Sequence, residues 1–151
     1  MSVSGQLAEL GIELPEVVTP VASYLPAVRS GNLVFTSGQL PMQAGKLLGV
    51  GKVGAGISPE AASVLARVCA LNALAAVDAL VGIDAVVRVV KVVGYVASAP
   101  GFHGQPGVVN GASDLLGEVF GAAGEHARSA VGVAELPLDA PVEVELIVEV
   151  G

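Results

Sequence analysis

The stretch that decides the fold is residues 124–151, GEHARSAVGVAELPLDAPVEVELIVEVG. After Pro141, valine and glutamate alternate almost to the end, which predicts a β-strand with one packed face and one acidic face. Residues 127–136 predict another strand, and 137–141 a turn between the two. Arg128 is the only lysine or arginine in the final fifty residues. A single cation in so acidic and apolar a segment is a candidate ligand-binding residue.

Two short apolar runs upstream also predict strands. Residues 27–36 hold a Ser30-Gly31-Asn32 turn signal between them, which is typical of a β-hairpin. Residues 45–56 are punctuated by glycine, and we expect at most a short edge strand there. A phosphate-binding loop is not indicated, because the G-x-x-x-x-G-K-[ST] spacing is missing and no helix starts directly afterwards.

Residues 58–82 have the clearest helical pattern. Ser58 suits the N-cap, Pro59 the first turn, and Glu60 complements the helix dipole. Apolar side chains follow at helical spacing, and Gly82 supplies the stop. This segment therefore predicts a long helix that packs through one apolar face.

The middle of the chain predicts one more strand and one more helix. Residues 85–98 are β-branched almost throughout, residues 109–121 read as a helix, and residues 99–107 contain three glycines and two prolines. The resulting order is β-β-(β)-α-β-α-β-β. It predicts a single α/β (α+β) domain over residues 1–151, a mixed sheet with two helices packed on one face.

Composition excludes several classes of function. The chain has 151 residues, a net charge of −7 and only 3% aromatic residues. Seven scattered basic residues do not form the patch that phosphate binding needs, so nucleic acid is not an expected partner. Charged residues interrupt every apolar run, so no membrane span is predicted. With Cys69 as a lone core thiol and no signal-peptide pattern, the expected compartment is the cytoplasm.

Two motifs lie at opposite ends of the chain: Tyr24 with residues 27–28 and 31–41, and residues 127–137 with 142–145. Together they resemble the RidA/YjgF family of reactive-intermediate deaminases. The resemblance implies a chorismate-mutase-like fold and a homotrimer with small-molecule clefts between subunits. It also implies hydrolysis of enamine and imine intermediates to 2-keto acids and ammonia, with no cofactor. Some members carry an older label of endoribonuclease or translation inhibitor.

The resemblance assigns two candidate catalytic residues. Arg128 matches the arginine that binds the substrate carboxylate, which a planar guanidinium can do with two parallel hydrogen bonds. Glu143 matches the acidic residue near the reacting centre, where it would orient or activate water. The expected partner is therefore a small carboxylate metabolite.

Further residues would line the cleft by the same resemblance. Tyr24 matches the cleft tyrosine, and Asn110 the asparagine at the start of the second helix. Ser37 and Gly38 match a turn whose backbone approaches the ligand. Ala130 occupies a substrate-binding position where the deaminases commonly carry cysteine.

Departures from the family pattern leave the activity open. Besides Ala130, residues 25–26 are Leu-Pro where polar residues are usual, and the 97–107 loop is longer than expected. The alternative is a non-catalytic trimer that binds a carboxylate metabolite and regulates another process. RNA cleavage is disfavoured by the acidic charge and the scarcity of aromatic residues.

Ordinary structural roles compete with several of these assignments. Glu145 and Glu149 are interpreted as a solvated strand face, and Asn110 could simply cap its helix. His103 and His126 lack cysteine or paired carboxylates at ligand spacing, so the sequence predicts no metal site.

Overall fold

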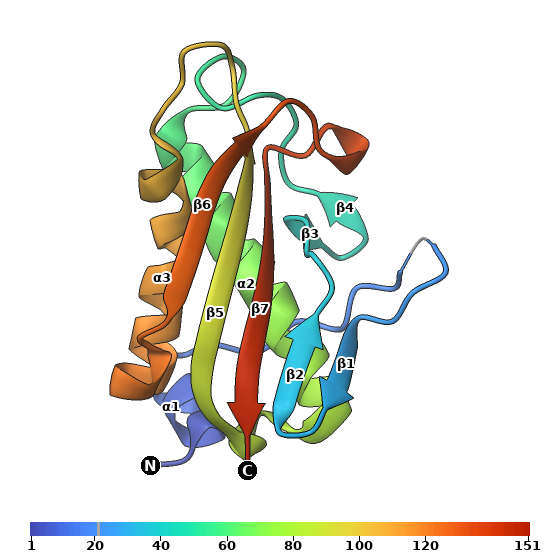
Figure 1. Cartoon of the computed structure of the whole chain (residues 1–151), viewed down its shortest axis with the longest axis vertical. Coiled ribbons are helices and arrows are strands. Elements are labelled where there is room, and N and C mark those ends of the chain that lie inside the picture. Colours follow the sequence, from blue (N-terminus) through green and yellow to red (C-terminus); the bar gives the residue numbers. More distant parts are fainter. Residues whose placement is uncertain (21) are drawn as a thin grey trace.

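The structure is a computed structural model of the chain and describes residues 1–20 and 22–151. A five-stranded sheet forms one layer of the fold (Figure 1). In spatial order its strands are β1 (Ala27–Ser30), β2 (Leu33–Thr36), β7 (Val142–Val150), β5 (Val86–Ala97) and β6 (Ala127–Val133). Only the β5–β6 pair is parallel, so the predicted mixed sheet is confirmed.

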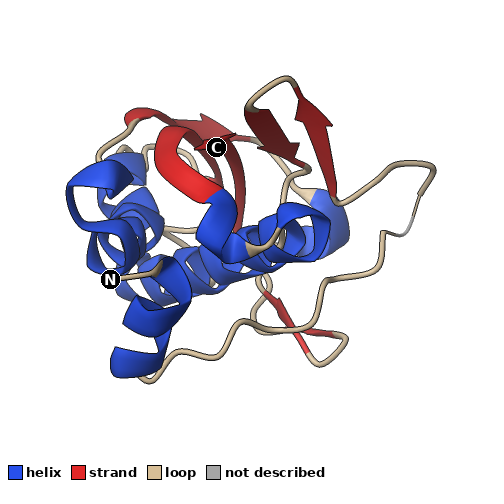
Figure 2. Ribbon diagram, turned by 90° about the horizontal axis from the view of Figure 1, so that it is seen from below, coloured by secondary structure: helices blue, strands red, loops and turns tan. Residues whose placement is uncertain are grey.

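Helices cover one face of this sheet (Figure 2). Helix α2 (Pro59–Val81) packs on β7, and α3 (Gln105–Phe120) packs on β5 and on α2. The cap of α2 is the predicted one, since Ser58 Oγ accepts a hydrogen bond from the backbone N–H of Ala61 over 3.1 Å. Gly82 ends the helix with a φ of 81°, a conformation that favours glycine. The prediction of two helices on one face is confirmed.

Helix α3 begins four residues earlier than predicted, at Gln105. The Gly-Pro composition of residues 99–107 suggested a loop, but Pro106 lies in the first helical turn, where its missing N–H costs no hydrogen bond. Gln105 also fixes the entry to the helix, because its Nε2 donates to the Phe102 carbonyl over 2.9 Å. Asn110 therefore lies inside the helix, and the interpretation of this residue as a cap is wrong.

Helix α1 (Val3–Glu9) was not predicted. Seven residues are too few for a clear helical period, and isolated helices of this length are unstable in water. Contacts elsewhere stabilise it: the backbone N–H and the hydroxyl of Ser4 donate to Asp84 over 2.8 and 2.7 Å. These hydrogen bonds also lower the pKa of Asp84.

Short elements complete the chain. Strands β3 (Met42–Gln43) and β4 (Lys46–Leu47) form a separate antiparallel pair, which accounts for the predicted short strand in 45–56. Single 3-10 turns follow α2, α3 and β6: η1 (Ile83–Ala85), η2 (Gly121–Gly124) and η3 (Pro137–Asp139). Strand β6 ends at Val133, three residues before its predicted end.

The core lies between the sheet and the helices and is almost entirely aliphatic. Strand β7 alternates as predicted, and its buried side chains are Val142, Val144, Leu146, Val148 and Val150. Helix α2 has the length and composition of a membrane span, but 56% of its apolar window is buried within the fold. Cys69 is fully buried in this core, and burial raises the pKa of its thiol well above the ordinary value.

The other face of the sheet carries no helix (Figure 2). Glu143, Glu145 and Ile147 alternate with the buried residues of β7 and so point to this side. Apolar side chains are exposed on it, with Val28 at 50%, Phe35 at 40% and Val131 at 43%. An exposed apolar surface of this kind marks an interaction face more often than a solvated one.

Candidate functional site

Arg128 lies on the edge strand β6 and points toward α3. Its register partner on β5 is the buried Val92, so both side chains lie on the helical side of the sheet. Nη1 donates to Asn110 Oδ1 over 2.7 Å and to Ser113 Oγ over 3.2 Å, and Nη2 donates to the Pro106 carbonyl over 3.4 Å. Asn110 and Arg128, both predicted site residues, are thus in direct contact.

No carboxylate among residues 1–20 and 22–151 forms an ion pair with Arg128. The two ion pairs in the described part of the chain are Lys52–Glu135 and Arg67–Glu118. A guanidinium has five N–H donors, and three neutral acceptors hold this one in place. Donors remain for an external carboxylate, and the fixed side chain would lose little entropy on binding it.

A second layer of side chains supports Arg128. His126 Nδ1 lies 2.5 Å from the Gly124 carbonyl, which can only accept, so Nδ1 carries the proton. In the neutral imidazole Nε2 is then an acceptor, and it receives the hydroxyl proton of Ser113 over 2.9 Å. The Ser113 oxygen in turn accepts from Arg128. This chain of hydrogen bonds runs from a backbone carbonyl to the guanidinium.

Ser113 and His126 were not predicted to support Arg128. Their spacing in the sequence could have indicated this role. Ser113 follows Asn110 by three residues on a helix, so both share one helical face. His126 precedes Arg128 by two residues, which places both on one side of an extended strand.

Close packing of α3 sets the position of Asn110. A side chain at Gly111 would overlap the Ser63 carbonyl of α2, and one at Gly94 would overlap Val109. Ala130 lies opposite Gly94 in the β5–β6 register and packs against the core. Small residues at these points let the helix approach both of its neighbours.

Glu143 lies on the open face of β7, against Gly38. A side chain at Gly38 would overlap the Glu143 carboxylate, so the carboxylate rests on the glycine backbone. Burial, and then the nearby charge of Glu145, raises the pKa of Glu143 above its ordinary value. A carboxylate of this kind takes up a proton more readily than a solvated one.

Glu145 is not merely solvated, which corrects the sequence interpretation. The Tyr95 hydroxyl donates a short hydrogen bond to its carboxylate. This hydrogen bond is the main cause that raises the pKa of Tyr95 to about 12. Tyr95 is the register partner of Glu143 on β5, so the tyrosine and both glutamates form one polar cluster. The sequence reading missed Tyr95, although its period-2 position in a β-branched run placed it on this face.

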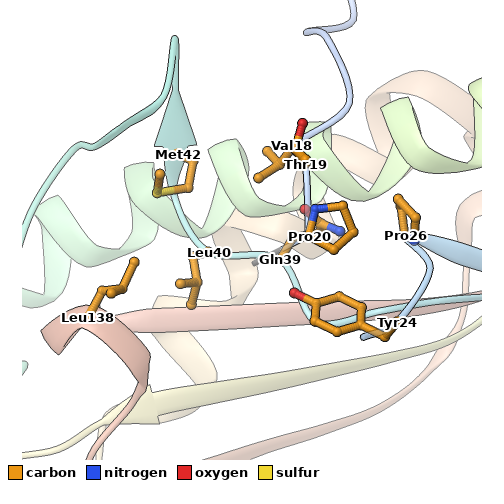
Figure 3. Close-up of a pocket in the computed structure, with 10 residues that line it drawn as sticks. Val18, Thr19, Pro20, Tyr24, Pro26, Gln39, Leu40, Met42 and Leu138 are labelled. Atoms are coloured by element: carbon orange, nitrogen blue, oxygen red, sulfur yellow. The ribbon is translucent and has the colours of Figure 1, made fainter. Parts of the chain in front are cut away.

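Tyr24 and Ser37 lie beside Gly38. Ser37 holds the preceding segment, because its Oγ donates to the Leu25 carbonyl over 2.5 Å and its N–H to the Pro26 carbonyl over 2.8 Å. Tyr24 is 49% exposed and lines, with Gly38, a cavity of about 70 Å³ (Figure 3). The structure thus brings Tyr24, Ser37, Gly38 and Glu143 together.

The two halves of the predicted site are separate within one chain. Arg128 pairs with Val92 of β5, which pairs with Leu146 of β7, whereas Glu143 lies three residues before Leu146 on β7. Two strand spacings and three residue rises put their Cα atoms about 14 Å apart. They also occupy opposite faces of the sheet. No cluster of three or more His, Cys, Asp or Glu side chains suited to a metal occurs among residues 1–20 and 22–151.

The chain matches a known protein family over almost its whole length. A family model described as "YjgF/chorismate_mutase-like, putative endoribonuclease" matches residues 4–150. The chain belongs to the YjgF/RidA family. The resemblance found in the two terminal motifs is thereby confirmed, and the fold is the chorismate-mutase-like fold of that family.

Relatives within this family span nearly the whole chain. Protein TCP17 of Trypanosoma cruzi is 43% identical, covering 99% of this chain and 94% of that protein. A crystal structure of Atu1372, a protein of unknown function from Agrobacterium tumefaciens, is 46% identical with a TM-score of 0.90, covering 99% and 92%. A crystal structure of a "putative endoribonuclease" from Shewanella oneidensis is 32% identical with a TM-score of 0.94, covering 99% of this chain and 100% of that one.

The YjgF protein of E. coli is more distant. It is 26% identical with a TM-score of 0.63, over 90% of this chain and 93% of that one. The two chains therefore share the YjgF fold at low sequence identity.

Proposed function

We propose that this chain is a RidA-like hydrolase that converts reactive 2-imino or enamino acids to 2-keto acids and ammonia. The observation that carries the proposal is Arg128, a guanidinium fixed by three neutral acceptors with no acidic partner in the described part of the chain. Such a group is prepared for a carboxylate ligand. Family membership supplies the class of reaction to test first.

The proposed reaction is addition of water to an imine. Arg128 binds the carboxylate through two hydrogen bonds and so fixes the adjacent imine carbon. The Glu143 carboxylate accepts a proton from water as the oxygen attacks that carbon and delivers it to the imine nitrogen, which takes up the C=N π electron pair. The same carboxylate then moves the hydroxyl proton of the resulting carbinolamine to nitrogen, so that the C–N bond breaks with its electron pair on nitrogen as the C=O bond forms. The products are a 2-keto acid and ammonia. The raised pKa of Glu143 supports this role, because the same group must take and release a proton.

The proposal places each site between copies of the chain in a homotrimer. Arg128 and Glu143 of one chain are too far apart for one small substrate, and they occupy opposite faces of its sheet. The exposed apolar residues of the open face, among them Phe35 and Val131, provide a surface for assembly. A monomeric mass in solution would contradict this arrangement.

The test is hydrolysis of imino acids generated in situ by an amino-acid oxidase, measured with wild type and two Arg128 variants. We expect Arg128→Ala to abolish the accelerated hydrolysis, and Arg128→Lys to retain little of it because lysine cannot pair bidentately. Arg67→Ala, which removes a surface ion pair between α2 and α3, is the matched control and should retain full activity. Glu143→Gln should lower kcat by about 10²–10⁴-fold.

The second candidate is a non-catalytic carboxylate-binding trimer. Ala130 favours it, since this position lacks the thiol common in the deaminases and its methyl group packs against the core. Carboxylate binding that depends on Arg128, without turnover of any imino acid, would favour this candidate.

A further inference from the structure

The cavity beside Tyr24 and Gly38 is lined almost wholly by apolar side chains (Figure 3). Leu40 and Met42 follow Gly38 along the chain, Leu138 projects from the η3 turn, and Pro20 and Pro26 flank the tyrosine. Among its lining residues, only Thr19, Tyr24 and Gln39 have polar groups in their side chains. Such a lining binds hydrocarbon rather than a second charged group.

Gly38 connects this apolar cavity with the proposed reacting centre. It lines the cavity, and its backbone also supports the Glu143 carboxylate. A substrate whose imine carbon lies near that carboxylate would therefore have its remaining substituent beside the cavity. The cavity volume of about 70 Å³ compares with the 10–15 Å³ that one water requires, so about five to seven water-sized groups fit, enough for a four-carbon side chain.

Leu138 forms one wall of the cavity from a strained backbone. Its φ is 59°, that of Asp139 is 61°, and neither residue is glycine. Left-handed conformations are unfavourable for leucine, and such strain concentrates at ligand-binding positions. The turn is held in place by the N–H of Gly51, which donates to the Asp139 carbonyl over 2.9 Å. The leucine side chain is nevertheless 62% exposed, so the fold gains little burial from it.

We infer that this cavity is a specificity pocket for an aliphatic substrate side chain of about four carbons, and that Leu138 is its specificity-determining residue. The inference rests on the proposed function. Among 2-imino acids, the pocket would favour those with a leucine-sized aliphatic substituent over those with a single methyl group.

Selectivity follows from hydrocarbon burial. Each additional buried methylene favours binding by about fourfold. A leucine-derived imino acid has three more carbons than an alanine-derived one, which gives roughly 60-fold with complete burial. Because the cavity stays partly open, we expect a kcat/KM ratio of about tenfold or more.

The test compares kcat/KM for the leucine-derived and alanine-derived imino acids in wild type, Leu138→Gly and Leu48→Ala. Glycine adopts the left-handed conformation freely, so Leu138→Gly removes the wall and relieves the backbone strain. We expect its selectivity ratio to fall to about threefold or less, through loss on the leucine-derived substrate alone. Leu48→Ala removes an exposed leucine that does not line the cavity, and should leave the ratio unchanged.

A parallel measurement separates this inference from the proposed function. Calorimetry would compare binding of 4-methylpentanoate and propanoate, which need no turnover. Preference for 4-methylpentanoate that is lost in Leu138→Gly supports the pocket, even where no imino acid is hydrolysed. A wild-type ratio near one, or a ratio that Leu138→Gly leaves unchanged, overturns the pocket while the hydrolase proposal stands. If neither imino acid is hydrolysed, the hydrolase proposal alone is overturned.

Discussion

The Ser113 hydroxyl lies 2.9 Å from Nε2 of His126, and this pair supports the guanidinium that the proposed reaction uses. Nothing in the pair needs to touch the substrate. Its effect is positional: it limits the rotamers of Arg128, so the free N–H groups stay aimed at one place.

Removing this support should weaken carboxylate binding. We expect Ser113→Ala to raise the Kd for a small carboxylate by about 10- to 150-fold, because a hydrogen bond to a charged group contributes about 1.5–3 kcal/mol. KM for an imino acid should rise similarly, with a smaller change in kcat. His126→Ala should have a comparable effect, and the double variant should be little worse than either single one, since both act through one network. Asp114→Asn, on the exposed side of α3, is the control. Additive losses would contradict the network.

Gly38→Ala should displace the Glu143 carboxylate. The new methyl group would overlap Oε1, so the glutamate side chain must move. We expect a destabilisation of about 1–3 kcal/mol in chemical unfolding, together with loss of imine hydrolysis. Gly56→Ala is the matched control, because a side chain there meets open space without a left-handed backbone. Equal behaviour of the two variants would show that the Gly38 contact is unimportant.

Glu143 should make stability depend on pH in a defined direction. Its pKa is raised in the folded state above its ordinary value of 4.5, so the folded chain holds this proton more tightly than the unfolded chain. The resulting stability is present at low pH and is lost as pH rises from about 4.5 through the raised pKa. Glu143→Gln stays neutral throughout. The free energy of unfolding of the variant, minus that of wild type, should therefore increase between pH 4 and pH 7. A constant difference in urea unfolding across this range would contradict the assignment.

We expect the hydroxyl of Tyr95 to ionise only at high pH. The chain contains two tyrosines, and Tyr95 has a pKa of about 12 because it donates to Glu145. Absorbance at 295 nm should show a phase near pH 12 that is missing in Tyr95→Phe. The same variant should lose about 1 kcal/mol of stability, a modest value because the pair is only partly shielded from solvent. A single early phase in wild type would show that the hydrogen bond is absent.

Elements with strong local signals could be predicted from sequence. The Ser58-Pro59-Glu60 start and Gly82 stop of α2, the hairpin turn at Gly31-Asn32 and the alternation of β7 were all identified correctly. Local signals failed at the start of two helices. Helix α1 depends on Asp84, eighty residues away. The first turn of α3 contains a proline, which suits a loop as well as a first helical turn.

The sequence indicated which residues belong to the candidate site but not how they are arranged in space. Motif resemblance indicated Arg128 and Asn110, and the structure brings them into contact. It could not show that Glu143 faces away from Arg128, because that depends on the register of β5 against two different strands. Leu138 could not be identified either, since its left-handed backbone has no sequence signature in a leucine.

The central position of β7 has a consequence for how the chain folds. Within the sheet, the hairpin of β1 and β2 is joined to β5 and β6 only through β7. Leu33 pairs with Glu149, so closing the sheet joins segments more than a hundred residues apart. Local contacts in residues 59–120 can form early, whereas this closure carries a large loop entropy and belongs to the slow step. Mutations at the early-forming helix caps and at the β2–β7 seam should therefore both slow folding, whereas mutations in contacts that form after this closure should act mainly on the unfolding rate.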